Sequence, residues 1–306
     1  MHYIKTIGAL IVCLLAVAFA LSRLFSSVFA KKASVSEVSS FSRYDDSELQ
    51  EIRTAHESGD TAKADALYKI QEQSAKQGML QAQYVVGVCC ANGWGTKQDA
   101  KKAFAWYKKS AEQGNAEAQN SLGRCCFYGD GTRQDYGQAF AWFKKAAEQG
   151  NAKAQNNLSN CYAKGLGTEQ DLAQAFAWIK KAAEQGNSYA QYGLGNCYFA
   201  GYGTEQDLAQ AFEWFKKSAE QGNAYAQYNL GNCYYNGNGT EQDYGQAFAC
   251  YKEAAEQGMA EAQYNLGVCY YNGHGTAENE AQARYWYEKA AEQGIADAQE
   301  ALRTGF

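Results

Sequence analysis

Cysteine is the residue type whose regular spacing in this chain first suggests chemistry. Such a series suggests stacked helical repeats that carry either a disulfide ladder or a metal array. Equivalent residues of packed helices lie about 8–10 Å apart, whereas a disulfide requires Cα atoms within about 7 Å. We therefore predict buried, free thiols that act as small apolar side chains. The series consists of Cys89, Cys125, Cys161, Cys197, Cys233 and Cys269.

The sequence lacks the usual residue sets of enzymes. Its three histidines, His2, His56 and His274, are scattered, so we expect neither a metal cluster nor a histidine-activated nucleophile. The Gly-x-Gly-Thr turns lack the lysine of a phosphate-binding loop. There is no Ser-x-x-Lys motif of the kind used by penicillin-recognising serine enzymes. We expect no catalytic residue, no metal site and no cofactor.

The spacing of the cysteines is part of an internal repeat. Glycine recurs at the same interval of 36 residues, from Gly78 to Gly294. We number each repeat from the residue after this glycine, so that position 1 of the first repeat is residue 79. A degenerate helical pair is expected at 46–78, and a C-terminal capping helix at 295–306. Six consecutive repeats fill the region 79–294, namely 79–114, 115–150, 151–186, 187–222, 223–258 and 259–294.

Each repeat is predicted to form two short helices. The first covers about positions 2–14 and buries Ala at position 4, Leu or Val at 8, and Cys at 11. A small residue at position 9, Gly in five repeats and Ser159 in the third, lets the partner helix approach closely. The second helix follows an Asp or Asn at position 21, with Gln three residues later in five repeats, which is a capping-box arrangement. We expect the tryptophans at position 28 of the first four repeats to lie in the core: Trp106, Trp142, Trp178 and Trp214.

These residues resemble the Sel-one-like repeat family, relatives of the tetratricopeptide repeats. The shared skeleton is A-x-x-x-L-G-x-x-Y-x-x-G, a Gly-rich turn, D, A-x-x-W and A-A-x-x-G, over about 79–306. Cys250 in place of Trp, and Arg284 in place of Phe, are departures expected to weaken single interfaces. The resemblance implies an all-α, right-handed α-solenoid of tetratricopeptide-like repeats that binds proteins or peptides. Bacterial members are often exported and linked to envelope or host-interaction roles.

The candidate ligand site lies on the other face of the first helices. Positions 3, 6, 7, 10, 13 and 14 are expected to face the concave groove, and they are rich in Asn and Tyr. Asn offers a peptide both a donor and an acceptor, Tyr adds contact area, and Arg124 can hold a carboxylate bidentately. The alternative is a solvated polar face. The predicted groove residues are Arg124, Asn156, Asn160, Tyr192, Asn196, Tyr228, Asn229, Asn232 and Asn265.

The N-terminal region reads as a separate module. Lys5 precedes an uncharged apolar run over residues 6–22, and Ala18-Phe19-Ala20 is a small-x-small site suited to signal peptidase. We expect residues 1–30 to be a cleaved signal peptide or, alternatively, a membrane anchor through residues 6–22. Residues 31–45 are a polar linker. Export places the cysteines in an oxidising compartment, whereas free thiols are typical of a reducing one.

Composition narrows the class of partner. The formal net charge is −5 and no basic stripe occurs, so we expect no nucleic-acid partner. We therefore predict a non-catalytic scaffold, exported, periplasmic or anchored to the inner membrane, that binds a protein or peptide in its groove. The membrane is expected as a partner only through an uncleaved N-terminal segment. The alternative that the resemblance leaves open is a weak penicillin-binding or β-lactamase-like envelope hydrolase.

Overall fold

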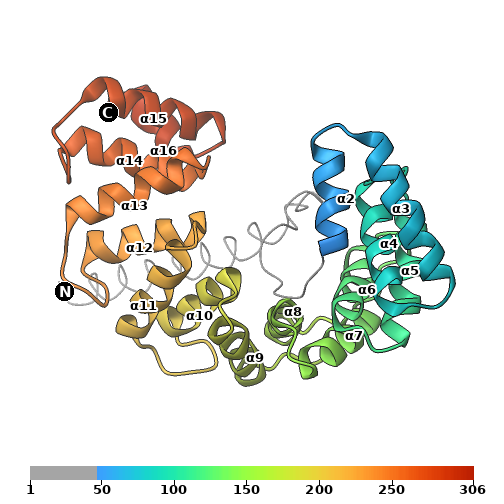
Figure 1. Cartoon of the computed structure of the whole chain (residues 1–306). Coiled ribbons are helices and arrows are strands. Elements are labelled where there is room, and N and C mark those ends of the chain that lie inside the picture. Colours follow the sequence, from blue (N-terminus) through green and yellow to red (C-terminus); the bar gives the residue numbers. More distant parts are fainter. Residues whose placement is uncertain (1–46) are drawn as a thin grey trace. The chain divides into compact units, whose positions relative to one another are not determined.

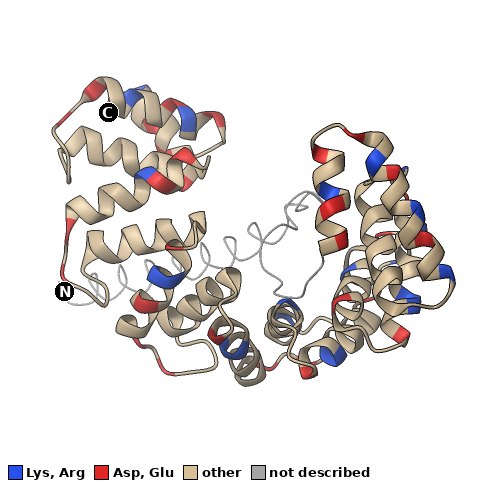
Figure 2. Cartoon of the chain, viewed as in Figure 1, with Lys and Arg blue, Asp and Glu red and all other residues tan. Residues whose placement is uncertain are grey.

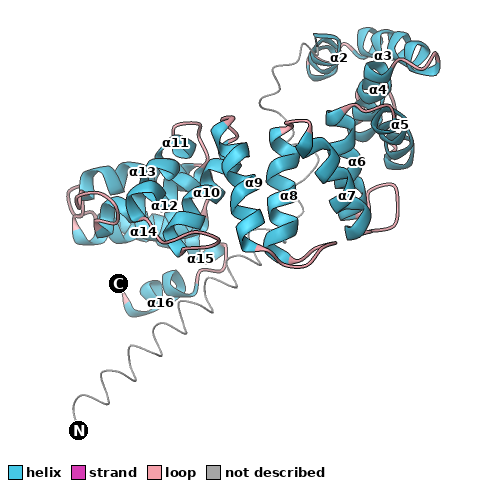
Figure 3. Cartoon of the chain, turned by 90° about the horizontal axis from the view of Figure 1, so that it is seen from below, coloured by secondary structure: helices cyan, strands magenta, loops and turns pink. Residues whose placement is uncertain are grey.

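The part of the chain that the computed structural model describes, residues 47–306, consists of α-helices joined by turns and contains no strand (Figures 1 and 3). The predicted segments 1–30 and 31–45 lie outside the described residues. The helices are α2 (Ser47–Glu57), α3 (Thr61–Lys76), α4 (Leu80–Asn92), α5 (Ala100–Glu112), α6 (Ala116–Tyr128), α7 (Tyr136–Glu148), α8 (Ala152–Lys164), α9 (Leu172–Glu184), α10 (Ser188–Ala200), α11 (Leu208–Ala219), α12 (Ala224–Asn236), α13 (Tyr244–Glu256), α14 (Ala260–Asn272), α15 (Glu280–Glu292) and α16 (Ala296–Thr304).

Asn and Asp caps begin most helices of the repeats, whereas α4 and α14 begin after Met79 and Met259 without a side-chain cap. In the fifth repeat, the Asn223 side chain accepts a hydrogen bond from the Ala226 amide, and the Asp243 side chain accepts one from the Gln246 amide. A full capping box would pair the Asp243 amide with the Gln246 side chain. That amide donates instead to the carbonyl of Tyr234, at 2.9 Å. The cap therefore also ties the start of the second helix to the end of the first.

The small residue at position 9 is where the two helices of a repeat meet. A Cβ atom added to Gly231 would lie 2.7 Å from ring atoms Cδ1 and Cε1 of Tyr251, so the ring occupies the space of the missing side chain. The third repeat has Ile179 in place of the ring and Ser159 in place of glycine, and the Ser159 hydroxyl donates to the Ala175 carbonyl at 2.7 Å. The predicted close approach is confirmed, and the two positions fit each other in every repeat.

A row of buried glutamines, which the sequence analysis missed, links the repeats. In the fourth repeat, Nε2 of Gln221 donates to Oε1 of Gln191 at 2.6 Å, and Nε2 of Gln191 donates to the Ala183 carbonyl of the preceding repeat at 3.3 Å. Gln191 is buried, so each of these bonds replaces contact with water. The same Gln–Gln bond occurs in all six repeats, between positions 35 and 5.

Consecutive helices make the main contacts, so the described helices form a solenoid in which each repeat rests on the one before it. In the middle of the array, the first helices α6, α8 and α10 lie on the inner side of the bend, and the second helices α7, α9 and α11 lie on its outer side (Figure 1). The predicted all-α solenoid is confirmed. Because the first helices all lie on the inner side, those of their residues that do not pack against the second helices form a continuous inner surface.

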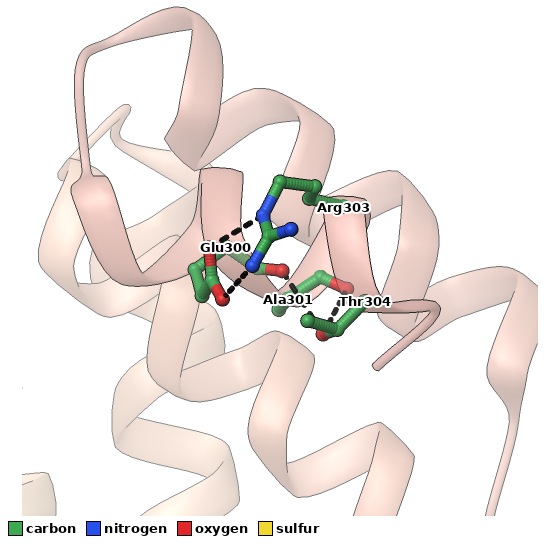
Figure 4. A network of polar contacts seen from close by, with 4 residues as sticks. All are labelled: Glu300, Ala301, Arg303 and Thr304. Carbon is green, nitrogen blue, oxygen red and sulfur yellow. Dashed lines mark hydrogen bonds and ion pairs between the residues drawn. The ribbon is translucent and has the colours of Figure 1, made fainter.

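The last described helix, α16, packs on α15. The Phe306 ring lies 5.3 Å from the Tyr287 ring, and the Arg284 guanidinium carbon lies 4.9 Å from the Phe306 ring centroid. Arg284, which departs from the repeat pattern, therefore covers an aromatic ring. Near the end of α16, Arg303 donates to both carboxylate oxygens of Glu300, at 2.6 and 2.9 Å, in an exposed pair (Figure 4).

Candidate functional site

The predicted groove residues fall into three groups on the first helices. All nine side chains are half-buried. Arg124, Asn156 and Asn160 come from α6 and α8. Tyr192, Asn196 and Asn229 come from α10 and α12, and the third group comes from α12 and α14: Tyr228, Asn232 and Asn265.

The third group forms a hydrogen-bonded cluster between the fifth and sixth repeats. The Tyr251 hydroxyl donates to Oδ1 of Asn232 at 2.7 Å, and Nδ2 of Asn265 donates to the same oxygen at 3.4 Å. The Tyr228 hydroxyl contacts both Asn232 and Asn265. Burial raises the pKa of Tyr228, although these amide contacts oppose the rise. Here the asparagines serve the interface between repeats.

The second group repeats this arrangement one unit earlier. Nδ2 of Asn229 donates to Oδ1 of Asn196 at 3.3 Å, and the Tyr192 hydroxyl contacts both amides. Phe215 stands where the next repeat has Tyr251, so this cluster lacks the third hydroxyl. The Tyr192 ring lies 6.1 Å from that of Phe215 and 5.9 Å from that of Tyr225. Bonds longer than about 3.2 Å are weak, so the asparagines can exchange them for a ligand.

The first group differs, because its polar side chains form no hydrogen bonds with other residues of the described chain. Arg124 and Asn160 form no hydrogen bond or ion pair with any residue in 47–306. Nδ2 of Asn157 on α8 donates to Oδ1 of Asn120 on α6, in the preceding repeat, at 2.9 Å. Asn156 is half-buried and likewise has no hydrogen-bond partner in the described chain. A small pocket of about 20 Å³ is lined by Arg124, Phe127, Tyr128, Phe143, Asn157 and Asn160.

Gly193 explains why the asparagine series is interrupted at Asn160. In the later repeats the donor to position 10 is Asn229 or Asn265, each at position 7 of the following repeat. Gly193 stands at position 7 of the fourth repeat and offers no side chain. A Cβ there would lie 3.2 Å from Cδ1 of Ile179, a tight contact. The side chain of Asn160 therefore faces the pocket without a hydrogen-bond partner among residues 47–306.

The most exposed aromatic side chains of the inner helices are not the predicted ones. Tyr192 and Tyr228 are half-buried, whereas Tyr189 is 57% exposed and Tyr128 is 53% exposed. Tyr271 on α14 follows at 39%, and Tyr225 on α12 at 37%. The helices α10 and α12 carry no charged residue, as the ribbon coloured by charge shows (Figure 2). Their surface is thus rich in aromatic rings and amides, and it lies next to the pocket that the Arg124 guanidinium lines.

The cysteines have the surroundings of core residues. Cys89, Cys125, Cys161, Cys233 and Cys269 are buried, Cys197 is half-buried, and all are free thiols. Burial raises the pKa of the Cys161 thiol to about 12, so it is protonated at neutral pH. The prediction of buried thiols is confirmed for the five, and Cys197 is less covered than expected. Within residues 47–306, no group of three or more His, Cys, Asp or Glu is placed to hold a metal ion.

The tryptophans at position 28 of the first four repeats lie half-buried against the core, on the second helices. A lysine three residues later covers each ring, with the ammonium nitrogen 4.1–4.3 Å from the ring centroid. The pairs occupy the same place in four successive repeats, which indicates a structural role. They are Trp106–Lys109, Trp142–Lys145, Trp178–Lys181 and Trp214–Lys217.

In the described part of the chain, no helix has both the length and the apolar character needed to cross a membrane.

Comparison with known proteins identifies the repeat. The Sel1 repeat family model matches residues 80–115, 116–151, 152–187, 188–223, 224–259 and 260–295. No curated protein matches the chain.

Two solved structures show how far the similarity extends. One is a protective antigen present in uropathogenic Escherichia coli strains that displays an SLR fold. It is 36% identical over 82% of this chain, with a TM-score of 0.69, and this chain covers 58% of its length. The other, a Sel1 repeat protein from Oxalobacter formigenes, is 31% identical over 88% of this chain and 83% of its own, with a TM-score of 0.70. The chain therefore belongs to the Sel1 repeat family.

Proposed function

We propose that this protein is a scaffold that binds a peptide segment of another protein along the inner surface of its first helices. Sel1 repeats generally form interaction modules. The observation that carries the proposal is the row of half-buried polar side chains on this surface, in which Arg124 and Asn160 have no internal partner in the described chain. Desolvating polar groups without pairing them is costly, so a ligand that pairs them has a place to bind.

The neighbouring helices add to this surface. A peptide backbone presents donors and acceptors in alternation, and asparagine amides can pair with both. Tyr189 and Tyr225 offer apolar contact area from α10 and α12. The absence of charge on these two helices favours an uncharged stretch of ligand there. The surface therefore suits an extended segment that spans several repeats.

Photo-crosslinking tests this proposal directly. We would replace Tyr189 by benzoylphenylalanine in the producing cell and compare it with the same replacement of Tyr285 on α15, which is similarly exposed at 47%. Crosslinks to a partner are expected from Tyr189 and not from Tyr285. The crosslink should weaken when Arg124→Gln and Asn160→Ala are added. Equal crosslinking at both tyrosines, or none at Tyr189, would count against the inner surface.

We further propose that the protein acts in the bacterial cell envelope or outside the cell, with export through its N-terminal segment. The apolar run and the Ala18-Phe19-Ala20 site support this proposal. A solved relative is described as a protective antigen, which fits exposure to a host. Cell fractionation with N-terminal sequencing separates the outcomes: a mature start at Leu21 supports cleavage, and an intact chain in the membrane fraction supports an anchor. An intact chain in the cytosol contradicts export.

A further inference from the structure

Asparagine is followed directly by glycine at four places in the sequence, each at or just after the end of a first helix. Such a pair is prone to deamidation, because the glycine nitrogen can attack the side-chain carbonyl carbon of asparagine without hindrance from a Cβ atom. The attack requires a glycine amide and an asparagine side chain that hydrogen bonds do not restrain. The pairs are Asn92-Gly93, Asn236-Gly237, Asn238-Gly239 and Asn272-Gly273.

Three of these pairs are held by the helix that they end, namely those at Asn92, Asn236 and Asn272. In each, the glycine amide donates to the carbonyl of the cysteine at position 11 of the same repeat. Nδ2 of the asparagine donates to the carbonyl four residues earlier, at 2.8–3.1 Å. The nitrogen that would attack and the nitrogen that would leave are therefore both engaged.

The pair Asn238-Gly239, in the turn between α12 and α13, lacks both restraints. The backbone amide of Asn238 donates to the Cys233 carbonyl at 2.9 Å, which places the residue in the turn. The side-chain amide of Asn238 and the backbone amide of Gly239 form no hydrogen bond with any residue in 47–306. Asn238 is half-buried and Gly239 is exposed, so water has access to the pair.

We propose that Asn238 is a site of spontaneous deamidation in the folded protein. The Gly239 nitrogen forms a bond to Cγ of Asn238, the bond from Cγ to Nδ2 breaks, and ammonia leaves with the proton of the Gly239 amide. The product is a cyclic succinimide. Water then opens the ring at one of its two carbonyl carbons and gives either aspartate or isoaspartate, in which the backbone runs through Cγ. Water is the co-reactant, and no group is oxidised or reduced.

The reaction would change the interface between the fourth and fifth repeats, because this turn rests on the start of α11. A Cβ added to Gly239 would overlap the carbonyl oxygen of Leu208, the first residue of α11. The equivalent of Asn238 in the next repeat, His274, likewise stacks on Tyr244, the first residue of α13, at 4.5 Å. Isoaspartate adds a carbon atom to the backbone of this tight turn, and both products add a carboxylate.

Ageing of the purified full chain in mildly alkaline buffer, followed by peptide mass spectrometry, tests this site. Fragment ions distinguish Asn236 from Asn238 in the same tryptic peptide. In the folded chain we expect Asn238 to deamidate at least about tenfold faster than Asn236 or Asn272, which corresponds to about 1.4 kcal/mol in the activation barrier. In guanidinium chloride, where the helices are lost, the three rates should become similar.

A matched pair of variants assigns the effect of ageing to this turn. Asn238→Gln keeps an amide but requires a larger ring, so it should abolish the reaction at this position. The other repeats place different residue types there, among them Leu166 and Tyr202, so the fold should tolerate the change. Amide hydrogen exchange in α11 and α12 should become faster on ageing in the wild type and in Asn236→Gln, and should stay constant in Asn238→Gln.

Three outcomes would overturn the proposal. They are equal rates at Asn236 and Asn238 in the folded chain, no reaction at Asn238 under conditions in which the denatured chain reacts, and a faster reaction at Asn272 than at Asn238. If Asn238 reacts first but hydrogen exchange in α11 and α12 does not change, the site is correct and its effect on the interface is wrong.

Discussion

At the scale of single residues, Gly231 and the Tyr251 ring share a space that admits no further carbon atom. An added Cβ would also lie 3.3 Å from Cβ of Cys250, so it would be crowded by a second residue as well as by the ring. We expect Gly231→Ala to lower the free energy of unfolding by about 1–3 kcal/mol through overpacking. Chemical denaturation followed by circular dichroism measures this change.

A second glycine provides the matched control. Gly137 lies in α7 and is exposed, and a Cβ there would meet only Oδ1 of Asp135, at 3.4 Å. Because alanine is the better helix former by about 1 kcal/mol, Gly137→Ala should leave stability unchanged or raise it. If both substitutions shift stability by the same amount, helix propensity and not the ring contact decides the effect.

The Cys161 thiol links burial to pH. Burial raises its pKa to about 12 in the folded protein, whereas the pKa of a cysteine in an unfolded chain is about 8.5. The unfolded state alone loses the proton between these values, so the stability that burial gives is complete below about pH 8.5 and is lost as pH rises toward 12. Between pH 8 and pH 10, the free energy of unfolding should decrease in both proteins. The decrease should be smaller in Cys161→Ala than in the wild type, by about 1–2 kcal/mol.

Denaturant titrations at the two pH values measure this difference. Ser159→Ala, a substitution in the same helix that removes no titratable group, should keep the wild-type loss. An identical loss in Cys161→Ala and the wild type would show that this thiol does not contribute.

At the scale of helices, the bond between Asn232 on α12 and Tyr251 on α13 can be isolated by a double-mutant cycle. Asn232→Ala leaves the buried Tyr251 hydroxyl without its 2.7 Å acceptor, which should cost about 1–3 kcal/mol. Adding Tyr251→Phe removes the hydroxyl that has lost this acceptor and reproduces the ring found in the second and fourth repeats. We expect the double variant to be more stable than Asn232→Ala alone, by thermal or chemical denaturation. Additive losses would mean that the two groups are not coupled.

The helices themselves follow closely from the sequence, because caps and core positions recur with one period. Asp243 and Asn223 start helices as predicted, and Leu230 and Cys233 are buried as predicted. The internal use of the polar residues could not be predicted in the same way. Whether an asparagine bonds a neighbouring repeat depends on residues 33 to 37 positions away, as in the pairs Asn229–Asn196 and Asn157–Asn120. Such pairs are visible only after the repeats are stacked.

The buried glutamines, such as Gln191, could have been found from the sequence. An Ala-Gln pair stands at positions 4 and 5 in every repeat, although position 5 is buried. A polar residue that recurs without change at a buried position indicates a hydrogen bond that every repeat needs. The pocket at Arg124 has the opposite signal, because Gly193 interrupts the asparagines that stand at position 7 in the third, fifth and sixth repeats. Departures from the repeat therefore point to the candidate site better than its regular positions do.

At the scale of the whole described unit, the main contacts join consecutive helices. Stability in such an array is close to a sum of repeat and interface contributions. A change at one end should therefore loosen the neighbouring repeat and leave distant repeats unaffected. This property separates the consequences of damage near α16 from the binding behaviour of α6 and α8.

Phe306→Ala tests this expectation. It removes the ring that packs against Tyr271 and Tyr287 and that Arg284 covers. Amide hydrogen exchange should speed up in α14, α15 and α16, while protection in α6 and α7 stays at the wild-type level. Arg303→Gln, which breaks the exposed pair with Glu300 in Figure 4, is the control and should change exchange little. Equal loss of protection at both ends would show that the repeats unfold as one cooperative unit, and the pocket at Arg124 would then depend on the integrity of the distant end.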